Sequence, residues 1–276
     1  MGKLKHISAI SALCALLLVA CGGVRTSAQG SDNEASNANS TQVTLAELYD
    51  FRVVKEYPHS TKSYTQGLEY VDGVMWEGTG REGRSHLQRI DLTTGAVDIV
   101  ASLPKDEFGE GITHFRGEIY QLTWESHTAH VYDSNGRHLR DVKYRGEGWG
   151  ITTDGERLYM SDGTSTIRVV NPESFATDAS ICVTLDGQPL SLLNELEWVD
   201  GMIWANVYLT DAIVEIDPKT GVVVGYVDMP SLRELLINNP EAEAFNGVAY
   251  NPESGHFYVT GKDWNKIFEV EIIKGN

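Results

Sequence analysis

The sequence predicts an all-β fold, a five-bladed β-propeller that is closed by a strand from its N-terminal side. Three observations lead to this prediction. The 276 residues include 27 glycines and 9% aromatic residues, which suits many short strands joined by turns. A short sequence pattern recurs five times along the chain. The last copy lacks one strand, and an unassigned segment near the start can supply it.

The repeated pattern is a glycine and an apolar residue on one strand, followed by an aromatic residue on the next. The five copies begin at Thr65, Gly109, Gly148, Leu193 and Phe245. Their aromatic residues are Trp76, Tyr120, Tyr159, Trp204 and Tyr258. A fixed internal repeat of this length, with strands and turns in each copy, is typical of propeller blades.

Each copy continues into a third and a fourth strand, separated by turn residues such as Asn135-Gly136. The fourth strands are expected at 96–103, 138–144, 179–185 and 222–229. The fifth copy reaches the end of the chain without one. Residues 51–57 alternate in polarity and belong to no copy, so pairing with the last blade would close the ring and protect its edge. One helix is expected at 231–237, where Ser231 and Glu234 have capping-box spacing.

Residues 1–20 have the features of a lipoprotein signal peptide. Two lysines precede an apolar run at 7–20, which is too short to span a bilayer comfortably. The run ends in Leu18-Val19-Ala20-Cys21, which resembles the bacterial lipobox, where cleavage precedes a cysteine that is lipidated. A plain signal peptide that contains a cysteine by chance is the alternative.

The rest of the chain divides into a tether and a domain. Residues 21–42 begin with the lipidated Cys21 and are rich in Ser, Asn, Gly and Ala, which predicts a flexible tether. Residues 43–276 hold all five repeats and form the propeller domain. We expect an exported bacterial lipoprotein, anchored at the outer membrane by its lipid alone and facing the periplasm or the cell surface.

Charge and cysteine content exclude several functions. The chain has 22 Lys and Arg against 39 Asp and Glu, a net charge of −17, which makes nucleic acid a poor partner. Once Cys14 is removed and Cys21 is lipidated, Cys182 remains, so no intrachain disulfide can form. Its strand-like surroundings predict a buried, inert thiol. A closed ring needs no partner, so a monomer is expected.

The repeats place unlike residues at equivalent positions around the channel. The residues before the glycine, which Glu195 replaces in the fourth copy, form one ring: Gln66, Glu110, Trp149, Asn194 and Asn246. The second strands give another: Gly80, Trp124, Gly163, Tyr208 and Lys262. An acid, a lysine, amides and large aromatics at one mouth of a channel predict a small-molecule pocket. Taken singly, each has a structural alternative, such as a tryptophan in the core or a lysine paired with an acid. A zinc site at His127 and His130 is a weak candidate.

Several short motifs of the sequence together resemble a known family, the plant and bacterial glutaminyl-peptide cyclotransferases. The motifs are Tyr64-Thr65-Gln66-Gly67-Leu68, Phe108-Gly109-Glu110-Gly111-Ile112-Thr113, Gln121-Leu122-Thr123-Trp124, Gly148-Trp149-Gly150, Leu193-Asn194-Glu195-Leu196-Glu197, Ala205-Asn206-Val207 and Val259-Thr260-Gly261-Lys262-Asp263-Trp264. The resemblance implies a five-bladed propeller that converts the N-terminal glutamine of peptides and proteins into pyroglutamate and releases ammonia. It is unrelated to the zinc-dependent animal enzymes.

The resemblance also implies roles for individual residues. Glu110 would be the acid/base residue, and Lys262, Asn194 and Gln66 would complete the catalytic set. The residues expected to bind substrate are Trp124, Trp149, Tyr208, Tyr64 and Trp264. The family usually has Phe at position 64 and Trp at position 208, so the tyrosines keep a ring but add a hydroxyl. No cofactor is expected for the chemistry. The resemblance implies that the central channel can carry a structural divalent metal, whose ligands stay unassigned.

The chemistry of cyclisation suits this set of residues. The α-amine must attack the γ-carboxamide carbon of its own side chain, so holding a folded substrate is much of the task. Glu110 would accept the amine proton and deliver it to the departing ammonia. Lys262, with Asn194 or Gln66, would stabilise the oxyanion. Two alternatives remain: a metal-dependent propeller lactonase or hydrolase that uses Glu110, Asn194 and Asn246 as ligands, and a propeller that only binds.

Overall fold

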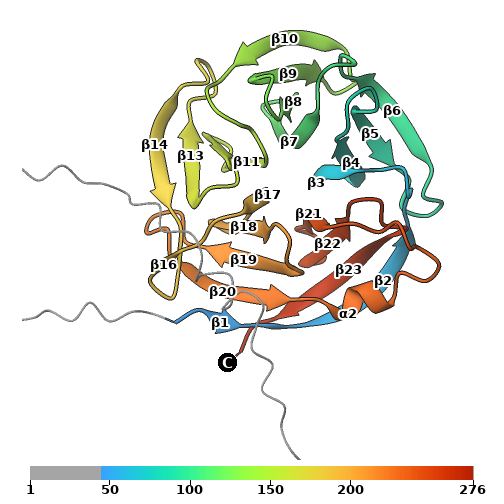
Figure 1. The fold of residues 1–276 in the computed structure, drawn as a ribbon, viewed down its shortest axis with the longest axis vertical. Helices are drawn as coiled ribbons and strands as arrows, with labels where there is room; N and C mark the ends of the chain where they lie inside the picture. Colours follow the sequence, from blue (N-terminus) through green and yellow to red (C-terminus); the bar gives the residue numbers. More distant parts are fainter. Residues whose placement is uncertain (1–44, 276) are drawn as a thin grey trace, which may run out of the picture.

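The computed structural model describes residues 45–275, which form five antiparallel sheets around a central axis (Figure 1). Blade one contains β3 (Thr65–Val71), β4 (Val74–Thr79), β5 (His86–Ile90) and β6 (Val97–Ser102). Blade two contains β7 (Gly109–Phe115), β8 (Glu118–Thr123), β9 (Thr128–Asp133) and β10 (His138–Lys143). Blade three contains β11 (Ile151–Thr153), β12 (Leu158–Met160), β13 (Thr166–Val170) and β14 (Thr177–Cys182). Blade four contains β17 (Leu193–Val199), β18 (Met202–Val207), β19 (Ala212–Ile216) and β20 (Val223–Asp228).

The ring closes as the sequence predicts. Blade five contains β21 (Phe245–Asn251), β22 (His256–Gly261) and β23 (Lys266–Ile273), and its fourth strand is β2 (Asp50–Pro58). Strand β2 pairs with β23 in antiparallel register, so that the first and last strands of the propeller lie side by side. Strand β1 (Glu47–Leu48) adds in parallel to β20, which the repeats did not predict. A small hairpin, β15 (Thr184–Leu185) and β16 (Gln188–Pro189), links blades three and four.

The core lies between neighbouring blades. Five clusters of buried apolar side chains occupy the five interfaces, and each contains one of the repeated aromatic residues. Burial of such a side chain stabilises a fold by roughly 1.5–3 kcal/mol. The repeated aromatic residue is therefore the one that joins each sheet to the next.

The repeated glycines let the inner strands approach one another. A Cβ on Gly150 would lie 2.1 Å from the backbone oxygen of Asn194, and one on Gly111 would lie 2.7 Å from that of Trp149. The backbone N–H of Gly111 donates to that Trp149 oxygen at 2.8 Å. These contacts fix the positions of the inner ring residues relative to one another along the channel axis.

Two expectations differ from the structure. Helix α2 (Ser231–Glu234) is a single turn that begins after Pro230, and no side chain caps it. Ser231 is inside the helix and not before it, so the capping box is wrong. Cys182 is exposed, not buried, because β14 is the outer strand of blade three and most of its residues face solvent.

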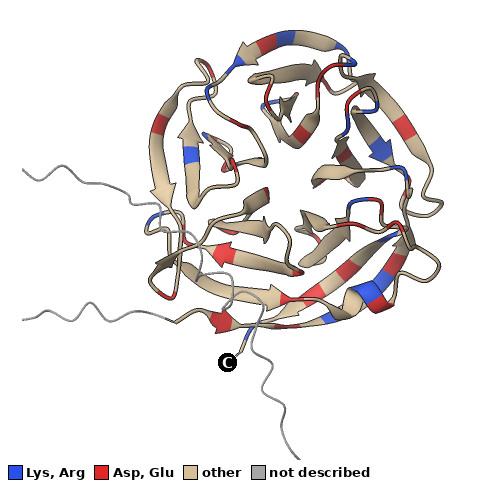
Figure 2. Cartoon of the chain, viewed as in Figure 1, with Lys and Arg blue, Asp and Glu red and all other residues tan. Residues whose placement is uncertain are grey.

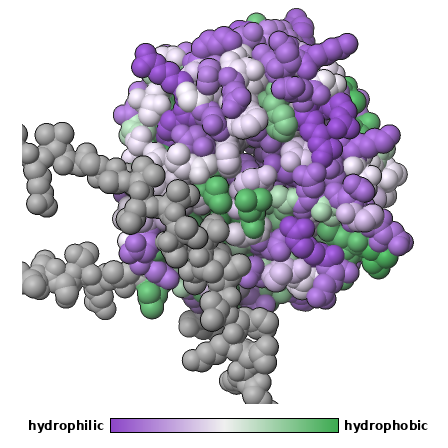
Figure 3. All heavy atoms as spheres, in the orientation of Figure 1, coloured by the Kyte–Doolittle hydropathy of each residue, from purple (hydrophilic) through white to green (hydrophobic). Residues whose placement is uncertain are grey.

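The signal peptide, Cys21 and the tether lie outside the described residues. Within residues 45–275, no helix is long and apolar enough to cross a membrane. Acidic residues are spread over many strands of the ring in Figure 2, and the face shown in Figure 3 is largely hydrophilic.

Candidate active site

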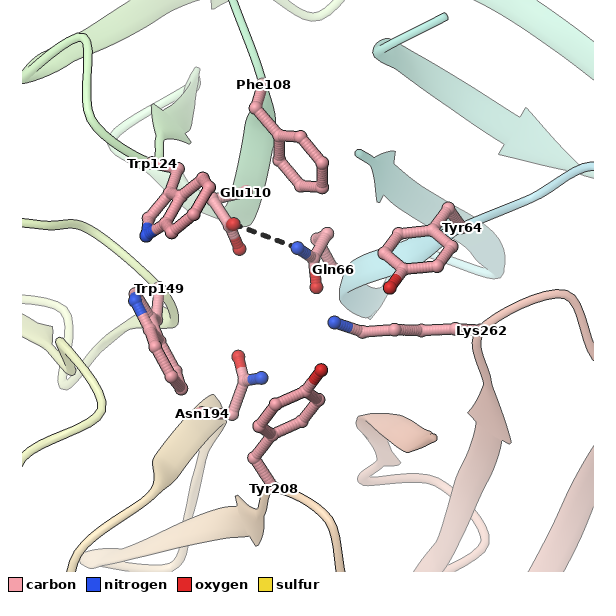
Figure 4. A pocket seen from close by; sticks show the side chains of 9 residues that line it. All are labelled: Tyr64, Gln66, Phe108, Glu110, Trp124, Trp149, Asn194, Tyr208 and Lys262. Atoms are coloured by element: carbon pink, nitrogen blue, oxygen red, sulfur yellow. Dashed lines mark hydrogen bonds between the residues drawn. The ribbon is translucent and has the colours of Figure 1, made fainter. Parts of the chain in front are cut away.

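A cavity of about 250 Å³ opens at one mouth of the channel (Figure 4). Its lining residues come from all five blades: Tyr64, Gln66, Phe108, Glu110, Trp124, Trp149, Asn194, Tyr208 and Lys262. The structure thus brings together eight of the nine residues that the sequence placed in the site. Position in the repeat decides which side chains meet here, although the residues lie as much as 198 positions apart (262 − 64).

Glu110 lies near the start of β7 and is almost completely buried. Gln66 Nε2 donates to Glu110 Oε1 at 2.8 Å. Burial raises the pKa of Glu110 well above its usual value; the Lys262 ammonium opposes this rise, the Glu147 carboxylate adds to it, and the Gln66 hydrogen bond opposes it. A carboxyl with a raised pKa holds a proton more readily than a free one, which suits a group that takes up and returns a proton.

Lys262 follows β22 and points into the cavity between two phenol rings. Its Nζ lies 4.7 Å from the ring centroids of both Tyr64 and Tyr208. Burial lowers the pKa of Lys262 to about 8, against the opposing effects of Glu110 and Glu243. The Lys262 amine is therefore largely protonated at neutral pH and able to donate a hydrogen bond.

One carboxylate orients both tryptophans of the pocket. Glu147 Oε2 accepts from Trp124 Nε1 at 2.7 Å and from Trp149 Nε1 at 2.9 Å. Trp149 also meets Tyr208 edge-to-face, with ring centroids 5.8 Å apart, and Trp124 meets Phe108 at 5.9 Å. The Glu147 carboxylate thus joins two pairs of aromatic rings, Trp124 with Phe108 and Trp149 with Tyr208.

Asn194 presents an unused hydrogen-bond acceptor. Its amide points into the cavity, and its buried Oδ1 has no partner among the described residues. An unsatisfied buried acceptor costs about 1–3 kcal/mol, so this atom suits a ligand that brings N–H groups. Asn246, the fifth member of the inner ring, does not line the cavity; its Nδ2 donates to Thr65 O at 3.1 Å.

A charged cluster at the mouth holds Tyr64 in place. The Tyr64 hydroxyl donates to Glu243 Oε2 at 3.1 Å. The Arg81 guanidinium lies 4.2 Å from the Tyr64 ring centroid and bridges Glu243 and Asp263, at 3.0 and 2.6 Å. The Tyr64 hydroxyl, which a phenylalanine would lack, therefore fixes the ring to the charged cluster at the cavity mouth.

Trp264 does not line the cavity, contrary to the expectation that it binds substrate. The side chain is fully buried in the core between blades four and five, against Phe245 and Phe268. Its Nε1 donates to the backbone oxygen of Glu243 at 3.1 Å. The strand ends at Gly261, where the next turn directs Lys262 into the cavity and Trp264 into the core.

Sequence reasoning missed Phe108 and Glu147. Each lies two residues before an inner-ring residue, as Tyr64 does, so the same repeat alignment applied to that position finds all three.

His127 and His130 do not converge on a shared metal position: His127 Nδ1 lies 2.7 Å from Gly146 O, and His130 meets two carboxylates.

Buried carboxylates also lie on the inner strands outside this cavity. Glu195 of β17 crosses to two other blades, accepting from Val248 N at 2.9 Å and from Leu68 N at 3.3 Å. Burial raises its pKa well above the usual value, and Glu197 adds to the rise. Burial likewise raises the pKa of Glu197, with a further rise from Glu69. The charges of Glu195, Glu197 and Glu69 thus act on one another, although Glu69 also pairs with His114.

Comparison with known proteins agrees with this geometry. The glutamine cyclotransferase family model matches residues 24–272. A glutaminyl-peptide cyclotransferase from Arabidopsis thaliana is 34% identical over 232 residues, covering 82% of this chain and 72% of the relative. The crystal structure of glutaminyl cyclase from Myxococcus xanthus is 33% identical, covers 84% of this chain and 100% of that chain, and has a TM-score of 0.76. An aldose sugar dehydrogenase from Streptomyces coelicolor, 12% identical with a TM-score of 0.55 over 81% of this chain and 98% of that chain, shares the fold alone. This chain belongs to the glutamine cyclotransferase family.

Proposed function

We propose that this protein is a glutaminyl-peptide cyclotransferase, an acyltransferase that converts the N-terminal glutamine of peptides and proteins into pyroglutamate with release of ammonia. The observation that carries the proposal is the buried Glu110, with its raised pKa, in a small aromatic cavity that also holds the Lys262 ammonium. A cavity of about 250 Å³ is smaller than most ligand pockets and suits one side chain. The rest of the bound peptide would extend out through the cavity mouth.

The proposed reaction needs one proton to move twice. The α-amine nitrogen attacks Cδ of the same residue, and Glu110 takes the proton that this nitrogen loses. Glu110 then returns the proton to the amide nitrogen, the old C–N bond breaks, and ammonia leaves. The Lys262 ammonium donates to the oxyanion between these steps. Gln66 keeps Glu110 in position through its hydrogen bond.

The walls favour ring closure over hydrolysis. Trp124, Trp149 and Tyr208 enclose the side chain and hold it folded, which brings the amine within reach of Cδ. Asn194 Oδ1 accepts an N–H of the substrate, which satisfies an acceptor that otherwise has no partner. Apolar rings around the reacting carbon leave little room for a competing water.

The test is ammonia release from a glutaminyl dipeptide, with the pyroglutamyl product identified by mass spectrometry. We expect turnover with and without chelator, and its loss in Glu110→Gln. A folded protein that releases no ammonia from a panel of glutaminyl peptides contradicts the proposal. Activity that is abolished by chelator would favour the lactonase alternative, although Asn246, one of its three ligands, does not line the cavity.

We propose that a divalent cation binds in the central channel and has a structural role. The supporting observation is the chemistry of the buried acids: Glu195, Glu197 and Glu69 offer carboxylate oxygens, the ligands that calcium and magnesium prefer. These oxygens do not all lie within 4.8 Å of one another, so the side chains would have to move toward the ion to share it. The ion would neutralise Glu195 and Glu197, whose partners are backbone N–H groups and not cations. Melting temperatures measured with calcium and with chelator test this, and Glu195→Gln should remove most of the difference between them.

We propose further that the protein is exported, lipidated at Cys21 and tethered through residues 21–42 as a monomer at the outer membrane. The basic start, the apolar run and the lipobox-like sequence support this. Fractionation of cells and detergent phase partitioning, compared between the wild type and Cys21→Ala, test the anchor. Recovery of the wild type in the aqueous phase contradicts it.

A further inference from the structure

A histidine-rich cluster lies on the outer side of blade two, away from the cavity. His130 Nδ1 and His138 Nε2 both approach one atom, Asp141 Oδ1, at 2.8 and 2.6 Å. The three atoms lie within 4.8 Å of one another. None of these residues lines the cavity, so the mechanism proposed above does not use them.

A β-bulge brings the cluster together. Strands β9 and β10 pair Asp141 with His130 and His138 with Tyr132, and the register shifts between His138 and Arg140. In an unbroken strand, residues 138 and 141 would point to opposite faces. The extra residue at position 139 directs His138 to the face of Asp141, a re-aiming that bulges commonly perform near functional sites.

A further carboxylate orients His130. Glu107 Oε2 hydrogen-bonds to His130 Nε2, and the His130 side chain is only 7% exposed. When Nε2 carries the proton that Glu107 accepts, Nδ1 of a neutral ring presents a lone pair toward Asp141 Oδ1. Two acceptors at 2.8 Å repel each other unless a proton or a cation lies between them. Carboxylate–histidine–metal arrangements use this second hydrogen bond to fix the ligating nitrogen.

We propose that His130, His138 and Asp141 bind a zinc ion, with a fourth coordination position open to water. Two imidazoles and a carboxylate suit zinc better than calcium or magnesium. Each histidine nitrogen must move about 0.6–0.8 Å away from the Asp141 oxygen to place the ligand atoms near 2.0–2.2 Å from the ion. The His138 and Asp141 side chains are 50% and 45% exposed, so they are free to make this movement.

The site also contacts the loop that leads to the cavity. Glu107 directly precedes Phe108, which lines the cavity, and β7 with Glu110 follows. A zinc ion would hold His130 and, through it, Glu107. Glu107 is therefore a positioning residue of this site, and its loss should weaken zinc binding by about 10–100-fold.

Isothermal titration with zinc chloride tests the proposal on the full-length protein, without a polyhistidine tag and after removal of metal by chelator. We expect a site that is weakened more than about tenfold in His138→Ala and in Asp141→Asn. His256→Ala is the matched control, since His256 also pairs with a carboxylate, Glu269 at 2.7 Å, on another blade. Both test positions are exposed, so the variants should keep the fold, which circular dichroism checks.

Cobalt(II) in place of zinc gives a second readout. Its visible absorption should report nitrogen and oxygen coordination in the wild type and in His256→Ala, and it should weaken in Asp141→Asn. Zinc affinity should fall as the pH is lowered, because protons compete for both imidazoles, which face Glu107, Asp141 and Tyr132. Equal zinc affinity in the wild type, His138→Ala and Asp141→Asn would overturn the proposal, as would an absent cobalt spectrum.

Discussion

Replacement of Glu147 separates two effects that one carboxylate has on the cavity. In Glu147→Ala, both indole N–H groups lose their acceptor. A hydrogen bond to a charged group contributes about 1.5–3 kcal/mol. Trp124 is 38% exposed, so water replaces much of what its indole loses. We therefore expect a net cost of about 1–2 kcal/mol in substrate binding, which is a rise of about 5–30-fold in KM.

The charge of Glu147 acts on the base itself. Because Glu147 raises the pKa of Glu110, its removal lowers that pKa. Glu110 must be ionised to accept a proton, so activity rises with pH through its pKa. The acid limb of kcat should move to lower pH in Glu147→Gln, which removes the charge and keeps an oxygen acceptor. In Glu147→Ala, the same movement should accompany the rise in KM.

Steady-state ammonia release from a glutaminyl dipeptide, measured across pH, checks both effects. Glu125→Gln is the matched control: it removes an exposed carboxylate next to Trp124 that does not contribute to the pKa of Glu110. We expect its KM and pH profile to match the wild type. A Glu147→Ala protein with KM within about twofold of the wild type and an unmoved acid limb would refute the shared-anchor argument.

Three further substitutions test other parts of the site. Glu110→Gln should lower kcat by about 10²–10⁴-fold with the fold intact, the usual contribution of a general acid/base; near-normal turnover would assign the proton transfer elsewhere. Lys262→Met should lower kcat by about 10²–10³-fold and raise the melting temperature at pH 7, because the pKa of Lys262, lowered by burial to about 8, marks a buried ammonium that destabilises the folded state below that pH; calorimetry checks the sign. Gly150→Ala should lower the melting temperature strongly, because its Cβ would lie 2.1 Å from Asn194 O; an unchanged melting curve would show that the inner strands can separate.

The fold could be predicted from the sequence because each of the two repeated residues, the aromatic and the glycine, has a physical role. The repeated aromatic residue fills an interface between blades, as Trp204 does between blades four and five. The repeated glycine lets neighbouring inner strands touch, as Gly111 does at Trp149. Strand β1 could not be predicted in this way, since two residues that add to an edge carry no pattern of their own.

The lining of the cavity could be predicted wherever it follows from the repeat. Lys262 and Trp124 occupy equivalent positions directly after the second strands of their blades, and both point into the cavity. Trp264 lies two residues beyond Lys262 in a turn, where strand alternation no longer decides direction, and it joins the core. Cys182 is exposed because an outer strand has solvent on one side, although its residues are as apolar as those of an inner strand.

Three polar groups of the cavity share one energetic property: the charged form of Glu110, that of Lys262 and the acceptor of Asn194 are each less stable there than in water. Burial raises the pKa of Glu110, burial lowers that of Lys262, and Asn194 Oδ1 lacks a partner. A folded protein tolerates such groups where the surrounding structure holds them in place. Here the closed ring holds them, because its inner strands are in contact and β2 pairs with the last strand, β23. A glutaminyl N-terminus offers an amine that gives its proton to the carboxyl, an amide whose oxygen accepts from the ammonium, N–H groups for the free acceptor and an apolar stem for the rings. The same features that make the empty cavity costly therefore favour the reacting substrate over water.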